Sequence, residues 1–233
     1  MIPMLTELKN VFITGTDTGV GKSIFSSLLA LYYLNQGKKV AISKPIQTGH
    51  PKDTDFLRNL TADKIVISNT YSFSLPAAPS VAAKHENKKI DLKKIINDIK
   101  ELENKFDHVI VEGIGGIAVP ITDNDTYLMS DLIKDLNYPV VIVVRPSLGT
   151  INHTVLTVEF AKQKGLNILG FVISGYDEKI SDEVIKTTPK EITRITGINC
   201  LLKIPYLKKL NYDSLVTSSE LLSSKAPNCL ANV

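Results

Sequence analysis

The chain of 233 residues lacks the features that mark several classes of protein. It contains no run of about 18 or more apolar residues and no signal-peptide pattern, so we expect no membrane span and a cytoplasmic location. Its two cysteines, Cys200 and Cys229, lie in no Cys-x-x-Cys or Cys/His cluster, which argues against a zinc site and favours reduced thiols. The net charge of +3 is not gathered into a dense basic block, so a nucleic-acid partner is not indicated.

What the chain does contain is a regular alternation of strand and helix patterns. Its length and its 43% hydrophobic content suit one large α/β domain, which we expect to span residues 1–233. Apolar, β-branched runs predict strands at 10–14, 39–44, 108–111, 139–144, 168–174 and 200–205. Helical patterns between them favour a mostly parallel sheet flanked by helices on both faces. No repeat of about 20 to 50 residues indicates a solenoid, and the tail over 214–233 has the weakest pattern.

The strongest motif is a glycine-rich turn, GTDTGVGKS, at residues 15–23. It lies between a predicted strand and a helical pattern, which is the setting of the phosphate-binding loop of P-loop NTPases. Backbone N–H groups of such a turn bind phosphate, Lys22 reaches the β- and γ-phosphate oxygens, and the Ser23 hydroxyl can ligate Mg²⁺. Five residues, where the standard motif has four, separate Gly15 from Gly21. The alternative interpretation is an ordinary loop followed by a solvated lysine.

Two further charged residues stand at the carboxyl ends of predicted strands. Lys44 ends the second strand, and Glu112 directly follows the strand at 108–111. Ligands of open α/β sheets bind at this edge, so we expect Lys44 to face the glycine-rich turn. Glu112 is placed to contact Mg²⁺, directly or through water, because buried glutamates are rare unless they are paired or bound to metal. The alternatives are a solvated lysine and a glutamate with a purely structural role.

Four motifs together resemble the dethiobiotin synthetase family across nearly the whole chain. They are GTDTxVGKS from Gly15, KPxQTG from Lys44, VEGxGG from Val111 and GxINH from Gly149, in the order in which that family has them. The resemblance implies an ATP- and Mg²⁺-dependent ligase of biotin biosynthesis. Such an enzyme closes a cyclic urea from 7,8-diaminononanoate and CO₂, through a carbamate and a carbamic-phosphoric anhydride, and it releases dethiobiotin, ADP and phosphate.

The same resemblance assigns roles to individual residues. The catalytic residues that it implies are Lys44, Lys22 and Thr18. The implied Mg²⁺ ligands are Ser23, Asp55 and Glu112. The implied substrate contacts are Thr48, Pro79, Ser80, Gly149, Thr150, Ile151 and Asn152. The implied nucleotide contacts are Gly19, Val20, Gly21, Lys22, Ser23, Ile24, Asp55, Glu112, Gly113, Ile114, Gly115, Ser174, Pro205, Tyr206, Leu207 and Asn211. Ser174 stands where the family usually has the asparagine that reads the adenine.

The family also implies a partner. Its substrate carboxylate is held at the helix start that matches residues 149–152 of a second subunit, which implies a homodimer with active sites at the interface. We expect small-molecule substrates and neither nucleic acid nor membrane as partners. The rival interpretation is a nucleotide-switch ATPase of the ParA or MinD type, although such proteins usually have an extra lysine early in the loop. An amidotransferase-type synthetase is a third alternative, but it generally carries an additional glutaminase domain.

Overall fold

The computed structural model describes residue 5 and residues 7–123, 126–177 and 183–223. Seven strands form one sheet in the order β4-β2-β6-β1-β7-β8-β9, and every neighbouring pair is parallel. Their bounds are β1 Asn10–Gly15, β2 Val40–Ser43, β4 Val66–Ser68, β6 His108–Gly116, β7 Val140–Val144, β8 Ile168–Tyr176 and β9 Cys200–Pro205. Two short strands, β3 Ile46–Thr48 and β5 Tyr71–Phe73, form a separate parallel pair.

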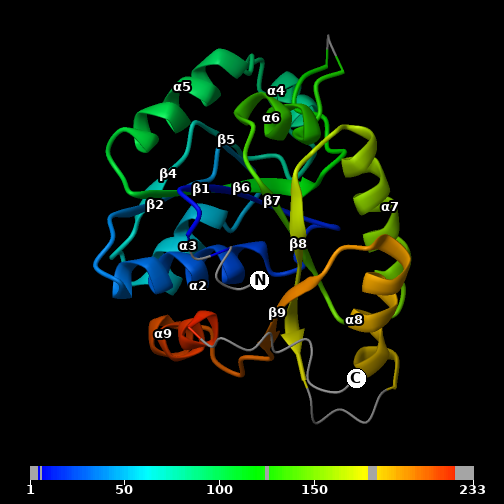
Figure 1. Ribbon diagram of the computed structural model, residues 1–233. Helices are drawn as coiled ribbons and strands as arrows, with labels where there is room; N and C mark the ends of the chain where they lie inside the picture. Colours follow the sequence, from blue (N-terminus) through cyan, green and yellow to red (C-terminus); the bar gives the residue numbers. More distant parts are fainter. Residues whose placement is uncertain (1–4, 6, 124–125, 178–182, 224–233) are drawn as a thin grey trace.

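Helices cover both faces of the sheet (Figure 1). One face carries α2 Lys22–Asn35, α3 Asp53–Thr61 and α9 Tyr212–Ser219. The other carries α4 Pro79–His85, α5 Leu92–Glu103, α6 Met129–Leu136, α7 Thr150–Gln163 and α8 Glu183–Thr196. A 3₁₀ turn, η1 Glu220–Leu222, follows α9. The expected α/β fold with helices on both faces is therefore confirmed.

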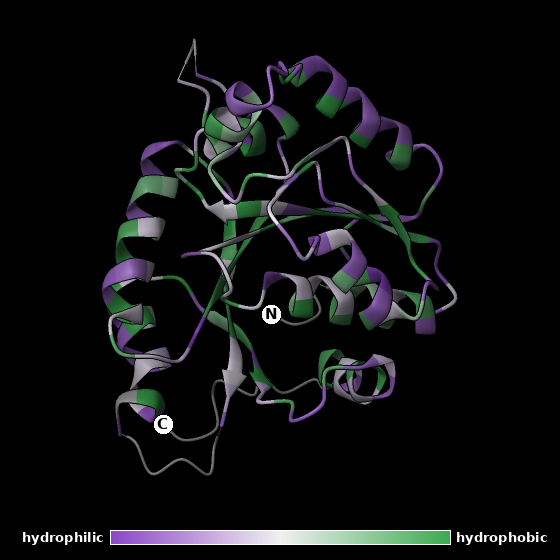
Figure 2. Ribbon diagram, turned by 180° about the vertical axis from the view of Figure 1, so that it is seen from behind, coloured by the Kyte–Doolittle hydropathy of each residue, from purple (hydrophilic) through white to green (hydrophobic). Residues whose placement is uncertain are grey.

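The strands separate two apolar cores because successive side chains of a strand point to opposite faces of the sheet. On β1, Phe12 packs into the core under α5 and α6, whereas Val11 and Ile13 pack into the core under α2. All five residues of β7 are buried, as expected for an interior strand of a parallel sheet. Figure 2 shows apolar colour along the strands and hydrophilic colour on the outer surfaces of the helices.

Several details differ from the sequence-based expectation. Strand β6 continues through Gly116, so Glu112 lies within the strand and not after it. The sequence analysis did not predict the strands β3, β4 and β5, because a segment of three residues is too short to show a hydrophobic periodicity. The prediction of a reduced thiol is wrong for Cys200, which is disulfide-bonded, and Cys229 lies outside the described residues. Within the described part of the chain, no helix is long and apolar enough to cross a membrane.

Candidate active site

The glycine-rich turn joins β1 to α2 at the carboxyl edge of the sheet. Gly19 and Gly21 have φ values of 71° and 103°, a backbone region that residues with a side chain rarely adopt. Gly21 is the N-cap of α2, and a Cβ at this position would clash with Ser174 Oγ and lie 2.6 Å from Ser174 Cβ. The glycine therefore allows the turn to pass close to the end of β8. The N–H groups of the first turn of α2 lie directly behind it.

Lys22 is held across the turn by main-chain oxygens. Its Nζ donates to the Asp17 carbonyl oxygen at 2.7 Å and to the Gly115 carbonyl oxygen at 2.8 Å. Burial of the side chain, and next the positive charge of Lys44, lower the pKa of Lys22 to about 8. The turn thus presents a buried ammonium group whose charge is costly until an anion approaches it.

Lys44 and Glu112 meet because β2 and β6 are neighbours in the sheet. Ser43 lies opposite Val111 in that pairing. Lys44 and Glu112, which follow these two residues in the chain, therefore lie side by side. Lys44 Nζ is 2.9 Å from Glu112 Oε1 and 3.1 Å from the carbonyl oxygen of Gly113. It also lies 2.6 Å from Asp53 Oδ2 at the start of α3. Burial lowers the pKa of Lys44, but the two carboxylates outweigh that effect and raise it above its usual value.

A divalent cation fits the carboxylate of Glu112. Ser23 Oγ donates to Glu112 Oε1 at 2.8 Å, while Glu112 Oε2 is buried and has no hydrogen-bond partner among the described residues. A carboxylate oxygen and a hydroxyl oxygen side by side are ligands that Mg²⁺ prefers. No group of three or more His, Cys, Asp or Glu residues gathers in the described ranges, so an ion here would keep water or substrate oxygens as further ligands.

The two carboxylates at the start of α3 have different surroundings. Asp53, to which the sequence analysis gave no role, contacts Lys44. Asp55, the predicted metal ligand, is 66% exposed and its Oδ1 lies 3.3 Å from Arg58 Nη1. The structure therefore brings Ser23, Glu112, Lys44 and Asp53 together, and it places the predicted ligand Asp55 outside this group, paired with Arg58.

A cavity of about 370 Å³ opens beside the glycine-rich turn. It spans the ends of β7, β8 and β9. Eight of the predicted nucleotide contacts line it: Gly19, Val20, Gly21, Ile24, Ser174, Pro205, Tyr206 and Leu207. Sequence reasoning missed four other lining residues, which are Arg145, Pro146, Gly175 and Leu210. The predicted contact Asn211 does not line this cavity, and its side chain caps α9 by accepting from Ser214 N at 3.0 Å.

The other predicted nucleotide contacts lie on the opposite side of the turn. Gly113 and Gly115 offer their carbonyl oxygens to Lys44 and Lys22, and Ile114 lies between them on β6. Thr18 is exposed at the tip of the turn, and its Oγ1 would lie 3.6 Å from a Cβ at Gly115. Within the glycine-rich turn, Thr18 therefore faces the end of β6.

The predicted substrate contacts are spread over three elements. Thr48 ends β3, Pro79 and Ser80 begin α4, and residues 149–152 begin α7 with Gly149 as its N-cap. Ser80 also lines a second cavity, of about 860 Å³, together with Lys84, Ile121 and other residues. The residues at the start of α7 line neither of these two cavities.

The chain is similar to several known dethiobiotin synthetases. A model of the family described as "AAA domain" matches residues 9–214. The "ATP-dependent dethiobiotin synthetase BioD" of Thermodesulfovibrio yellowstonii is 36% identical over 88% of this chain and 91% of its own length. The protein of that name from Bacillus subtilis strain 168 is 37% identical, over 90% of this chain and 92% of its own length. The one from Methanocaldococcus jannaschii is 45% identical, over 70% of this chain and 78% of its own length.

Solved structures of distant sequence share the fold. The "MinC:MinD cell division protein complex" of Aquifex aeolicus contains a chain with a TM-score of 0.62 at 15% identity, covering 94% of this chain and 98% of that one. The cell division ATPase MinD of Pyrococcus furiosus has a TM-score of 0.56 at 14% identity, with coverage of 93% and 99%. At this identity the likeness concerns the fold alone.

Proposed function

The chain belongs to the dethiobiotin synthetase family, and on that premise we propose that Lys22, Lys44 and Glu112 form its reaction centre. It catalyses ATP-dependent dethiobiotin synthesis, and it is a ligase of the biotin pathway. The observation that carries the assignment of the centre is the buried pair of Lys44 and Glu112, hydrogen-bonded to Ser23 of the glycine-rich turn.

The reaction must join a diamine to CO₂ through a carbamate, which is a poor electrophile until it is phosphorylated, because its oxygens are anionic and its leaving group would be oxide. One substrate amine attacks CO₂ and loses a proton, which gives a carbamate. A carbamate oxygen then takes the γ-phosphoryl group of ATP and releases ADP, so that a mixed anhydride forms. The second amine attacks its carbonyl carbon, loses a proton and expels phosphate, which closes the five-membered cyclic urea.

Two anions, the carbamate and the triphosphate, must approach each other in this reaction. Lys22 and Lys44 would neutralise them and stabilise the charge that spreads over the transferring phosphoryl oxygens. The three N–H groups of Lys44 already have protein partners, so it must exchange one of them for the carbamate. Asp53 is the partner that gives way most easily, because its side chain is 44% exposed and water can solvate it.

Mg²⁺ would be held by Ser23 and Glu112, with Asp55 turning inward from the start of α3. When bound, the ion supplies positive charge at the phosphate oxygens. Thr18 and Thr48 would donate to the carbamate or accept from the substrate amines. The nucleotide base would occupy the cavity lined by Ser174, Pro205 and Tyr206. Asn211, the N-cap of α9, would contact the base from outside these lining residues.

We also propose a homodimer and a cytoplasmic location. The first turn of α7 has no side-chain cap, and its main-chain N–H groups suit the far carboxylate of the substrate, except that of Thr150, which donates to the Ser147 carbonyl oxygen. Since these residues line neither of the cavities described above, they would serve the active site of a second subunit, beside its Pro79 and Ser80. Binding energy from that remote carboxylate would position the diamine for attack.

The test is phosphate release from ATP, measured with and without 7,8-diaminononanoate and bicarbonate. We expect release to require both, and we expect Lys44→Ala to abolish it while nucleotide binding persists. Release that is independent of the diamine would overturn the proposal. Release stimulated by DNA or lipid vesicles would favour the nucleotide-switch alternative. The similarity of the fold to MinD is the observation that supports this alternative.

A further inference from the structure

Arg145 occupies a position that the proposed reaction does not use. It directly follows β7, and β7 lies between β1 and β8 in the sheet. Its side chain therefore starts between the glycine-rich turn that follows β1 and Ser174 near the end of β8. The guanidinium Nη2 donates to the carbonyl oxygen of Gly19, and it would lie 3.5 Å from a Cβ at that glycine.

The cavity beside the turn has little charge apart from this guanidinium. Of the described residues that line it, Arg145 is the one with a charged side chain. The rest are glycines, apolar side chains and the hydroxyls of Ser174 and Tyr206. Among the described residues, no carboxylate lines the cavity to neutralise the guanidinium, so an anion that enters meets an uncompensated cation.

A guanidinium group can hold the turn and a ligand at once. It carries five N–H donors in a planar fork, and the contact with Gly19 is made by Nη2. The remaining donors match two oxygens of one phosphate group, the bidentate contact for which arginine is suited and lysine is not. The lysine of the turn, Lys22, is anchored on the other side, at Asp17 and Gly115.

We propose that Arg145 is a nucleotide-binding residue that fixes the glycine-rich turn through the Gly19 carbonyl and donates to a phosphate group of ATP. This inference rests on the proposed function, because it takes the cavity to be the nucleotide site. Arg145 would act on the phosphates and not on the base, so its contribution would be the same for every nucleoside triphosphate.

The experiment compares Arg145→Met and Arg145→Lys with the wild type. Dissociation constants for ATP, GTP and CTP are measured by competition against a fluorescent ADP analogue, without diamine. For Arg145→Met we expect affinity to fall about tenfold or more, by the same factor for all three nucleotides. Arg145→Lys keeps the charge but loses the fork, so we expect an intermediate loss for all three.

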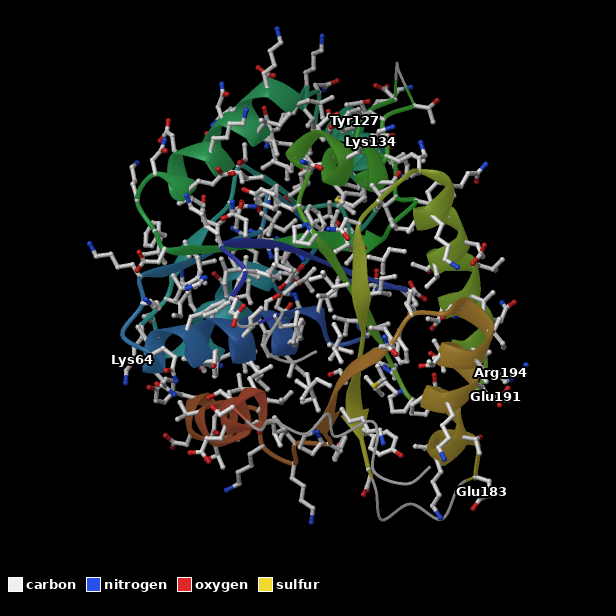
Figure 3. The ribbon with its side chains drawn as sticks, in the orientation of Figure 1. Lys64, Tyr127, Lys134, Glu183, Glu191 and Arg194 are labelled. Carbon is white, nitrogen blue, oxygen red and sulfur yellow. The ribbon has the colours of Figure 1, made fainter. Side chains whose placement is uncertain are left out.

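Arg194→Met is the matched control. Arg194 lies on α8 beside Glu191, as Figure 3 shows, and its Nη2 is 2.7 Å from Glu191 Oε2 on the exposed surface. We expect this variant to bind all three nucleotides as the wild type does. Urea unfolding of each variant establishes that the protein is folded at the assay temperature. In steady state, Arg145→Met should raise the KM for ATP and leave the KM for the diamine unchanged.

Two results would overturn the inference. One is an Arg145→Met variant whose three dissociation constants stay within about twofold of the wild type. The other is a loss that depends on the base, which would make Arg145 a base-reading residue. If either result is obtained and the wild type still makes dethiobiotin, the role of Arg145 is overturned and the proposed function stands. A wild type that binds no nucleotide would overturn the proposed function as well.

Discussion

Lys44 Nζ lies 2.9 Å from Glu112 Oε1, and both side chains are buried, with exposed fractions of 1% and 0%. A buried ion pair contributes little net stability, but the loss of one partner leaves an uncompensated charge in the interior. We therefore expect Lys44→Met to lower the free energy of unfolding by about 3 to 5 kcal/mol in urea titrations. Lys44→Met combined with Glu112→Gln should recover part of that loss, since the remaining side chain is neutral.

The control for this pair is an ion pair on the surface. Lys105 and Glu101 lie 3.4 Å apart with both side chains largely exposed, so Lys105→Met should leave the unfolding midpoint unchanged. A Lys44→Met variant as stable as the wild type would contradict the argument from the buried charge.

The lowered pKa of Lys22, about 8, predicts a pH dependence of nucleotide binding. The ammonium group is charged below pH 8 and loses its proton as the pH rises through that value, whereas the raised pKa of Lys44 keeps it charged. Affinity for ATP in the free protein should therefore fall by about tenfold for each pH unit above 8. Titration calorimetry between pH 7 and pH 9.5, in about equal steps, measures this.

Lys22→Arg serves as the control for the pH effect. A guanidinium group stays charged throughout that range, so its affinity for ATP, even if weaker, should not change with pH. The same decline in both proteins would assign the pH dependence to another group.

Two glycines of the turn differ in what surrounds them. Both Gly19→Ala and Gly21→Ala force a side chain into the left-handed backbone region, which costs about 1 to 2 kcal/mol. Gly21→Ala additionally drives a Cβ into Ser174, so it should be the more destabilising change in urea unfolding. Ser174→Gly in the Gly21→Ala background should remove the excess. If the two single variants lose the same free energy of unfolding, the clash with Ser174 does not destabilise the protein.

Leu148 tests the proposed dimer. It immediately precedes the N-cap of α7, the proposed contact of the substrate carboxylate, and it is 89% exposed. We expect Leu148→Asp to shift the protein toward monomers in sedimentation equilibrium and to raise the KM for the diamine. Val66 is 49% exposed on the edge strand β4, four strands away from β7 in the sheet, so Val66→Asp should keep the dimer. A dimeric Leu148→Asp protein with unchanged kinetics would contradict this.

The sequence predicted the sheet and the glycine-rich turn because long periodic runs and glycine spacing are local signals. It also placed Lys44 and Glu112 at one edge, since the carboxyl ends of parallel strands share an edge. It could not tell which carboxylate at the start of α3 meets Lys44. Residues two apart on a helix differ by about 200° in direction, and the docking of that helix on the sheet decides which of them faces inward.

Arg145 illustrates a different limit. The sequence shows an arginine after an apolar strand, but the position of its guanidinium depends on the neighbours of that strand in the sheet. Strand order arises from contacts between residues far apart in the chain, and no local pattern encodes it. The roles of residues 149–152 depend on a second subunit and stay a prediction.

Strand β6 holds both lysines through its backbone. The carbonyl oxygen of Gly113 accepts from Lys44 and that of Gly115 accepts from Lys22, so these anchors have no side chain that a mutation could replace. The backbone of β6 therefore helps to set the distance between the two positive charges. A substitution at Thr18 or Thr48, the proposed substrate contacts, would therefore leave the main-chain anchors of both lysines in place.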